Sequence, residues 1–408
     1  MLYFKNTELA KKYHVSLGTV RNWIVSAERG KLDLALHDTE DRKYILKTAT
    51  NTDTMNSIVE ERKKFRNSNA VKRISPSDKF YNLFSKEQVY DIATNLEIHH
   101  EVPLQYNYFN SGARAWNDHM KRLADEDVEN SFSATQALLE TSMGMLDSLL
   151  SNYDRVNIVD IGPGNAMPSR WLLEYLHNAG KLGKYIAIDI SPDMLKIAEK
   201  NIQKWFNGDV KFEGYTRNVN QDRFADLLIS DYFQGDKSRT VNIVLHLGYT
   251  LRNMQRPENG YRTIYDSIGK DDLLIEDNLL DTADTREHLD FSASPSAGGL
   301  FFLNALFVPL LGFKPSHYEV IHGFDKERSE RFSKIKLKVA IEIEFKIKGG
   351  GRIISLNKDD HIIVWRNRHY SARDIIEQRA NSGFSLLYSS QTESQEHMLS
   401  IFRVLATT

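Results

Sequence analysis

The segment from Val156 to Asn165 constrains the fold of this chain more than any other. It reads VNIVDIGPGN, an apolar run that predicts a buried strand, followed directly by a turn containing Gly162 and Gly164. The helix-like sequence PSRWLLEYLHNAG comes next. Glycines at such a turn let the backbone approach a ligand closely, and the start of the following helix offers free N–H groups. The segment therefore predicts an α/β domain that binds a nucleotide-type ligand where strand and helix meet.

Strand-like and helix-like segments alternate after Tyr153, which is typical of an α/β domain with a parallel sheet. A helix, ARDIIEQRANSG, and a strand, FSLLYSSQ, follow near the C-terminus and suit a sheet that ends in an antiparallel hairpin. Residues 76–153 read as mostly helical, so we expect one domain over residues 76–408 with a helical insertion at its start. The predicted strands are RVNIVDI, KYIAIDI, DVKFEGY, TVNIVLHL and DDLLIED, with KIKLKVAIEIEFKIK and HIIVWRNRHYS added in the C-terminal third.

The glycine turn departs from the dinucleotide-binding fingerprint, because Ala166 and Met167 stand where a third glycine would. The sequence DIGPG instead resembles motif I of class I methyltransferases, and the resemblance implies their Rossmann-like fold and S-adenosylmethionine as cofactor. The second predicted strand ends in Asp189, 27 residues after Gly162. A carboxylate there can accept hydrogen bonds from ribose hydroxyls, although an ordinary strand-end carboxylate is the alternative. The expected cofactor-binding residues are Asp160, Gly162, Gly164, Asn165, Asp189 and, in the turn 217–220 where such enzymes hold adenine, Asn218.

Two further segments resemble motifs of the histidine-specific N-methyltransferase family, which makes trimethylhistidine for ergothioneine. Residues 247–253, LGYTLRN, resemble the family's LGSTIGN segment. Residues 106–116, YNYFNSGARAW, resemble its Y-x-Y-D-x-x-G-S-x-L-F motif, and DIGPGN lies between the two in the family's order. The resemblance spans residues 100 to 400 and implies methyl transfer to an amine nitrogen.

The resemblance also implies roles for individual residues. Asn253 would grip an amino-acid-like substrate, with Gly248 in the same pocket; a helix cap is the alternative for Asn253. Tyr106 and Tyr108 would close over the cofactor or the substrate. Where the family recognises imidazole and amine with a Glu-Val-Ser stretch, this chain has Trp365 and Asn367, which counts against histidine as the substrate. The expected catalytic residues are Tyr108 and Asn253, and the expected substrate-binding residues are Tyr106, Gly248, Asn253, Trp365 and Asn367.

Three functions are compatible with these motifs. The first is a methyltransferase that acts on an amine of a small amino-acid-like molecule. Transfer from a sulfonium needs a neutral nucleophile held in line, so positioning is expected to contribute most, without a dedicated base. The second is a transcription regulator whose methyltransferase-like domain senses S-adenosylmethionine or another ligand without turnover. The third, a nucleic-acid methyltransferase, is disfavoured because the chain lacks an Asn/Asp-Pro-Pro-Tyr/Phe motif.

The first 50 residues predict a small helix-turn-helix domain. Two short helices are expected, Thr7 to His14 and Leu17 to Arg29, and their spacing resembles excisionase and resolvase modules. GKLDLAL and RKYILKT would form a two-stranded wing. Residues 1–75 hold 15 Lys and Arg against 9 Asp and Glu, so DNA is a possible partner and protein contact the alternative. The polar residues 51–75 are expected to be a linker, and the expected DNA-binding residues are Ser16, also placed to cap the second helix, Thr19, Arg21 and Asn22.

Several classes of site are excluded or disfavoured. The chain has no cysteine, which excludes disulfides, thiolate zinc sites and cysteine nucleophiles, and its histidines lack metal-site spacing, so no metal is expected. No apolar run is long enough to cross a bilayer and the N-terminus lacks a signal-like core, so a soluble, cytoplasmic protein is expected. The loop 292–299 could form a lid or a plain loop, and the apolar segment after it, LFFLNALFVPLLGF, could bury a helix or line a homodimer interface.

Overall fold

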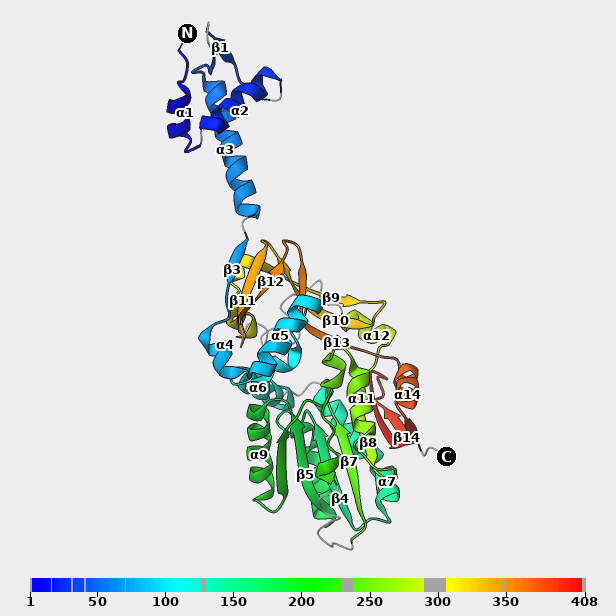
Figure 1. The fold of residues 1–408 in the computed structure, drawn as a ribbon. Helices are drawn as coiled ribbons and strands as arrows, with labels where there is room; N and C mark the ends of the chain where they lie inside the picture. The colour runs from blue at the N-terminus through cyan, green and yellow to red at the C-terminus, as the bar shows by residue number, and fades with distance from the viewer. Residues whose placement is uncertain are drawn as a thin grey trace. The chain divides into compact units, whose positions relative to one another are not determined.

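The computed structural model describes residues 2–15, 17–30, 32–39, 42–69, 71–125, 130–228, 238–289, 306–347 and 350–405. The chain forms two compact units, Met1–Lys72 and Arg73–Thr408 (Figure 1). Ser16, the loop 292–299 and the first part of the apolar segment after it lie outside the described residues.

The first unit contains two short helices, α1 (Asn6–Lys12) and α2 (Leu17–Glu28), the strands β1 (Leu36–Asp38) and β2 (Lys43–Ile45), and helix α3 (Ala49–Asn69). The strands pair antiparallel, with Leu36 opposite Ile45. The two helices and the two strands that the sequence predicts are therefore present, the strands shorter than expected. Their apolar side chains form one core of Phe4, Leu9, Tyr13, Val20, Trp23, Ile24, Leu34, Ile45 and Met55.

Residues 51–69, which the sequence indicated as a linker, instead continue helix α3. Asn51 donates through Nδ2 to the carbonyls of Ala35 (2.8 Å) and Leu46 (2.9 Å), and its Oδ1 accepts from the Ala35 N–H (2.8 Å). Met55, one turn further on the same face, is fully buried in the unit's core. The start of α3 is therefore a structural part of the first unit.

The second unit is built on a seven-stranded sheet of order β14-β15-β8-β7-β4-β5-β6. The first five strands of this sheet along the chain run parallel, which confirms the predicted α/β sheet. The sheet ends in an antiparallel hairpin, as expected, but β15, which pairs antiparallel with β8 and β14, was not among the predicted strands. β4 is buried on both faces, as expected for a central parallel strand. The strands are β4 (Arg155–Ile161), β5 (Leu182–Asp189), β6 (Lys211–Thr216), β7 (Thr240–His246), β8 (Leu273–Leu279), β14 (Phe384–Gln391) and β15 (His397–Val404).

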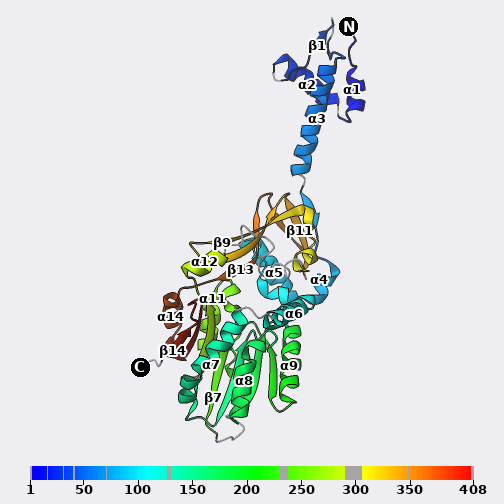
Figure 2. The same cartoon turned by 180° about the vertical axis from the view of Figure 1, so that it is seen from behind.

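Helices cover both faces of this sheet. α7 (Ser131–Leu150), α8 (Met167–Asn178) and α9 (Pro192–Phe206) share a core with one face, as Figure 2 shows. α10 (Ala225–Leu228), α11 (Pro257–Tyr265) and α14 (Ala372–Asn381) pack on the other. Short helices η3 (Leu251–Asn253) and α12 (Ala283–Leu289) follow β7 and β8.

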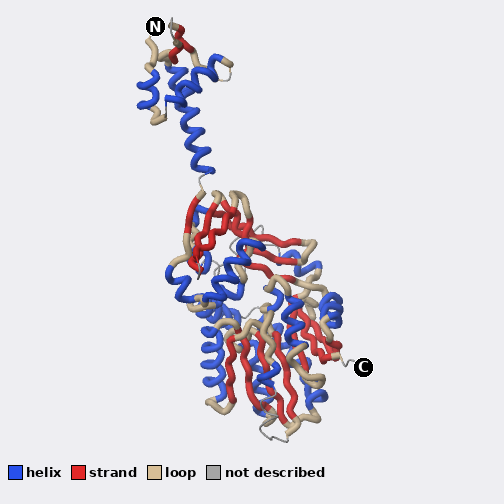
Figure 3. The backbone as a smooth tube through the Cα atoms, in the orientation of Figure 1, coloured by secondary structure: helices blue, strands red, loops and turns tan. Residues whose placement is uncertain are grey.

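A second group of elements has its own core, which the sequence did not predict. The strands expected to extend the main sheet form two smaller sheets, of order β13-β10-β9 and β12-β11-β3 (Figure 3). The helical residues 78–125 and the short helices η5 (Val308–Leu311) and η6 (Pro315–His317) accompany them, and aromatic residues from α4, η1 and β11 meet in one cluster. The other elements are β3 (Lys72–Ile74), α4 (Asp78–Leu83), α5 (Lys86–His99), η1 (Leu104–Tyr108), α6 (Ser111–Asp125), β9 (Tyr318–Asp325), β10 (Glu330–Leu337), β11 (Ile341–Ile347), β12 (Gly350–Leu356) and β13 (His361–Arg368).

The described part of the apolar segment before η6 is internal. Phe307, Val308, Leu311 and Phe313 are all buried in the second group's core, and Leu306 is exposed. These residues therefore stabilise the fold rather than offering a broad interface for a second copy. Among the described residues no helix is both long and apolar enough to cross a membrane.

Candidate functional site

A cavity of about 510 Å³ lies at the carboxyl ends of the parallel strands. The segments that follow β4, β5, β6 and β7 all line it, together with the end of β8. This is the edge where ligands bind in open α/β sheets, because successive strand ends and helix starts meet there. The volume is that of a typical small-molecule site.

The glycine turn after β4 forms one wall of the cavity. Gly162 and Gly164 have φ angles of 62° and 59°, a left-handed conformation that side chains rarely adopt. A Cβ atom on Gly162 would also collide with the side chain of Thr250. Asn165 lines the cavity and its Oδ1 accepts from the Met167 N–H (3.1 Å) at the start of α8. Gly162 and Gly164 therefore line the cavity and leave room for the side chains of Thr250 and Trp116 beside the turn.

Asp189, the last residue of β5, also lines the cavity. Its Oδ1 accepts from the Ser191 N–H (2.8 Å), and burial raises the pKa of its carboxyl to about 7. A ligand that donates two hydroxyl hydrogen bonds would pair with this half-buried carboxylate. In the turn after β6, Asn218 lines the cavity, and its Oδ1 accepts from the Asn220 N–H (3.1 Å).

Asp160 occupies a different place from the one expected. It lies below the glycine turn, is buried, and accepts a hydrogen bond from the Tyr185 hydroxyl (2.7 Å). Burial raises the pKa of its carboxyl to about 6. Asp160 does not line the cavity, because it precedes the turn and its carboxyl contacts Tyr185 of β5 and Ser169 of α8. Its contribution to a ligand site would be support of the turn.

The side chains of the two tyrosines of η1, Tyr106 and Tyr108, lie in different surroundings. Tyr108 lines the cavity, and burial together with the negative charge of Asp189 raises the pKa of its hydroxyl well above the usual range. Tyr106 instead donates to Asp91 Oδ2 (2.8 Å) and packs on Phe84 in the core of the second group. Two residues apart on a tight 3₁₀ turn, the side chains point in different directions. The structure therefore does not place Tyr106 at the cavity.

Polar side chains from several elements line the opposite end of the cavity. Asn253 ends η3, and it does not cap α11, whose N-cap is Arg256. Trp365 and Asn367 alternate along β13 with Arg366 and Arg368, so the first two face the cavity while the arginines bind Glu330 on the other side. Asn253 Oδ1, Asn367 Oδ1 and Trp365 Nε1 are buried without a hydrogen-bond partner, and Gly248 lines the same end.

Sequence reasoning missed several polar residues of the cavity, among them Arg331, Thr135, Asp277 and His397. Arg331 stands opposite Asn367 in the β10–β13 pairing, lies 5.6 Å from the Trp365 ring, and burial lowers the pKa of its guanidinium to about 10. Thr135, Asp277 and His397 line the cavity from α7, β8 and β15. Asp277 ends a predicted strand, a signal that could have been used. His397 lies on an antiparallel strand, for which the strand-end rule gives no signal.

In the first unit, Arg21 and Asn22 on α2 are exposed and Thr19 is half-exposed. The fourth expected DNA-binding residue, Ser16, is outside the described residues. No cluster of side chains suited to a metal ion occurs within the described ranges.

Comparisons with known proteins place these residues in context. The family model described as histidine-specific methyltransferase, SAM-dependent, matches residues 91–404. No curated protein sequence matches the chain. An S-adenosylmethionine-dependent methyltransferase from Clostridium acetobutylicum ATCC 824 has 10% sequence identity and a TM-score of 0.39, over 72% of this chain and 99% of that chain. The magnesium protoporphyrin IX methyltransferase of Synechocystis PCC 6803, with bound S-adenosylhomocysteine, has 13% identity and a TM-score of 0.38, over 74% and 98%.

Proposed function

Because the chain belongs to the histidine-specific, S-adenosylmethionine-dependent methyltransferase family, we propose that it methylates an amine nitrogen of a small amino-acid-like molecule. The enzyme is a class I methyltransferase, and S-adenosylmethionine supplies the methyl group. What remains to be proposed is the acceptor and the residues that hold it.

The residues present fit the cofactor. The backbone of the glycine turn can approach a ligand, and Asp189 can accept the ribose hydroxyls. Asn218 lines the part of the cavity beyond Asp189 where the adenine is expected. We assign this half of the cavity to the cofactor.

One observation supports the proposed methyl acceptor. In the half of the cavity that is not assigned to the cofactor, several buried hydrogen-bonding atoms have no partner. The side-chain oxygens of Asn253 and Asn367 can each accept a hydrogen bond, and the N–H groups of an amine can donate one. A buried polar atom left unpaired costs about 1–3 kcal/mol, so an acceptor that pairs with them gains affinity. Trp365 fills the place that the family uses to recognise imidazole, which favours an acceptor other than histidine.

The proposal is tested with methyl-labelled S-adenosylmethionine and a pool of the protein amino acids and their decarboxylated amines. Transfer to a pool member is expected, and Asn253→Ala should lower it by about 10-fold or more while cofactor binding persists. Asn259→Ala, which removes an exposed asparagine of α11, serves as the matched control. Cofactor binding without transfer to any member would contradict the proposal and favour a ligand-sensing regulator.

We further propose that the first unit binds DNA through α2. The support is local: Arg21 and Asn22 are exposed on the second of two packed helices, beside a two-stranded hairpin. A library of random-sequence duplexes should yield enriched sequences whose binding weakens as salt rises. Arg21→Ala with Asn22→Ala should abolish that enrichment, whereas Arg29→Ala at the end of α2 should not. Absence of salt-dependent binding would refute this role.

A further inference from the structure

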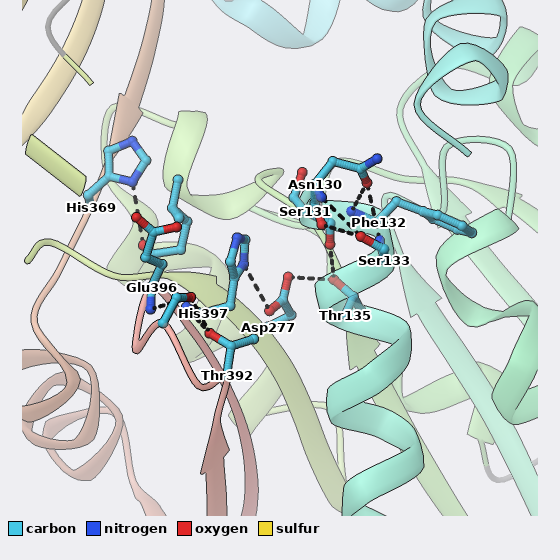
Figure 4. Close-up of polar contacts among 12 residues, drawn as sticks. Asn130, Ser131, Phe132, Ser133, Thr135, Asp277, His369, Thr392, Glu396 and His397 are labelled. Carbon is cyan, nitrogen blue, oxygen red and sulfur yellow. Dashed lines mark hydrogen bonds and ion pairs between the residues drawn. The ribbon is translucent and has the colours of Figure 1, made fainter. Parts of the chain in front are cut away.

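Asp277, His397 and Thr135 form a buried polar cluster at the acceptor half of the cavity. Thr135 Oγ1 donates to Asp277 Oδ2 (2.8 Å), and His397 Nδ1 lies 3.9 Å from Asp277 Oδ1. Figure 4 shows the three side chains in one row, with Asp277 between the other two. Only 2% of Asp277 and 6% of His397 are exposed, and all three residues line the cavity.

The strand pairing explains this arrangement. β15 runs antiparallel to β8, so His397, its first residue, lies opposite Leu279 at the carboxyl end of β8. Residues two apart on a strand share a face, which places Asp277 and His397 diagonally on the same side of the sheet. Thr135 reaches Asp277 from the first turns of α7.

The orientation of the ring leaves one nitrogen for a ligand. His397 Nδ1 faces Asp277, so Nε2 is the ring nitrogen that is not directed at this carboxylate, and His397 lines the cavity. Neither His397 Nδ1 nor Asp277 Oδ1 has a hydrogen-bond partner, and their separation is that of an ion pair. A carboxylate behind an imidazole orients the ring and attracts the charge that the ring gains when it accepts a proton.

Other charged and titratable groups surround the pair. Arg252 donates to the backbone carbonyl of Asp277 (3.3 Å), Arg331 lines the same cavity, and burial with the charge of Asp277 raises the pKa of Tyr249. Burial, Arg252 and Arg331 hold the pKa of nearby His369 well below its usual range. Asp277 is the carboxylate within ion-pair distance of His397 in the described structure.

We propose that the Asp277–His397 pair accepts the proton that the acceptor's ammonium group must lose before methyl transfer. An alkyl amine is protonated near neutral pH and has no lone pair for attack. The proton passes from the acceptor nitrogen to His397 Nε2, and the freed lone pair forms the C–N bond while the C–S electron pair stays on sulfur. The products are the methylated ammonium, S-adenosylhomocysteine and a protonated His397, which releases its proton to solvent. This role rests on the proposed function. It makes the Asp277–His397 pair a general base, whereas the sequence predicted an enzyme that positions the amine without a dedicated base.

The test compares the pH dependence of methyl transfer to the amino-acid and amine pool in the wild type and His397→Gln. Near neutral pH the variant should be slower by about 10²-fold or more, the usual effect of a general base. The difference should shrink toward about pH 10, where alkyl amines lose their own proton. Asp277→Asn should change the profile in the same way, and S-adenosylmethionine binding by calorimetry should be unchanged in both.

A second measurement does not depend on turnover. In protein labelled with ¹⁵N at histidine and bound to S-adenosylhomocysteine, addition of the unmethylated pool member that accepts the methyl group should move the His397 ring signals toward the imidazolium pattern. The signal is assigned by its loss in His397→Gln, and exposed His361→Gln is the matched control.

The outcomes separate the two proposals. If the wild type transfers no methyl group, the proposed function fails. If it transfers one and His397→Gln lowers the rate equally at every pH, or not at all, only the role of the pair is overturned. Unchanged ring signals on acceptor binding would also overturn it.

Discussion

Replacing Asp189 with asparagine should stabilise the empty enzyme and weaken cofactor binding. Asn keeps an oxygen that can accept from the Ser191 N–H (2.8 Å in the wild type) but carries no charge. Burial raises the pKa of Asp189 from 3.8 to about 7, so the folded state binds a proton that the unfolded state releases above about pH 4. Wild-type stability should therefore fall as pH rises from about 4 to about 7 and stay lowered above that.

The magnitude follows from the shift. Three pH units at about 1.4 kcal/mol each give roughly 4 kcal/mol, and water that enters the cavity screens about half of this. We expect Asp189→Asn to be more stable than the wild type by about 2 kcal/mol near pH 8, with the difference lost near pH 4. S-adenosylhomocysteine should bind about 100-fold more weakly, because two charge-assisted hydrogen bonds to ribose weaken.

Urea denaturation at several pH values, with and without S-adenosylhomocysteine, and calorimetric titration check both effects. Exposed Asp209→Asn, which lies after α9 and outside the cavity, is the matched control for cofactor affinity. The reasoning is refuted if Asp189→Asn is less stable than the wild type near pH 8, or if it binds S-adenosylhomocysteine with unchanged affinity.

Two further substitutions test other parts of the second unit. Gly162→Ala should reduce cofactor affinity by about 10-fold or more in calorimetry, because Gly162 has a positive φ and a Cβ atom there would collide with Thr250. Adding Thr250→Ala to the same chain should restore part of the affinity, and unchanged affinity in the single variant would contradict the reasoning. Arg379→Met should destabilise the fold by about 3–5 kcal/mol in urea denaturation near neutral pH. Burial disfavours the charged form of Glu276, but Arg379 and His246 outweigh this effect and lower the pKa of Glu276 to about 2. That stabilisation is present above the unfolded value of about 4.5 and is lost as pH falls toward 2, so a loss that does not diminish in acid would contradict the assignment.

The centre of the main sheet could be predicted from the sequence because β4, β5, β7 and β8 are mostly buried on both faces and contain apolar runs. The positions of Gly162 and Asp189 followed from the rule that ligands meet the carboxyl ends of such strands, whereas the role of Asn253 was implied by the family resemblance. The same rule could have identified Asp277, which ends the fifth strand.

The second group of elements could not be predicted in the same way. β10, β11 and β13 read as strands, but alternation of apolar and charged residues does not specify which sheet a strand joins. Their partners include residues about 260 positions earlier, such as Glu101, whose carboxylate binds Arg366. Tyr106 and Tyr108 show the same limit on a smaller scale, since the direction of a side chain on a 3₁₀ turn depends on the core it meets.

Helix α3 was missed for a different reason. Its mean composition is polar, and its contact with the core is made by Asn51 and Met55, which are buried, and by Ile58 and Val59, which are only partly buried. The buried side chain of Asn51 satisfies three backbone groups of the neighbouring hairpin, which no apolar pattern reports.

Alternate residues of β13 point to opposite sides of the strand and have different contacts. Arg366 and Arg368 hold the strand to Glu330 on one side, while Trp365 and Asn367 face the cavity on the other. Exchanges at positions 365 and 367 can therefore alter which amine is accepted without breaking the ion pairs that hold the strand. A lineage of such enzymes could diversify its substrates through these two positions while the scaffold stays constant.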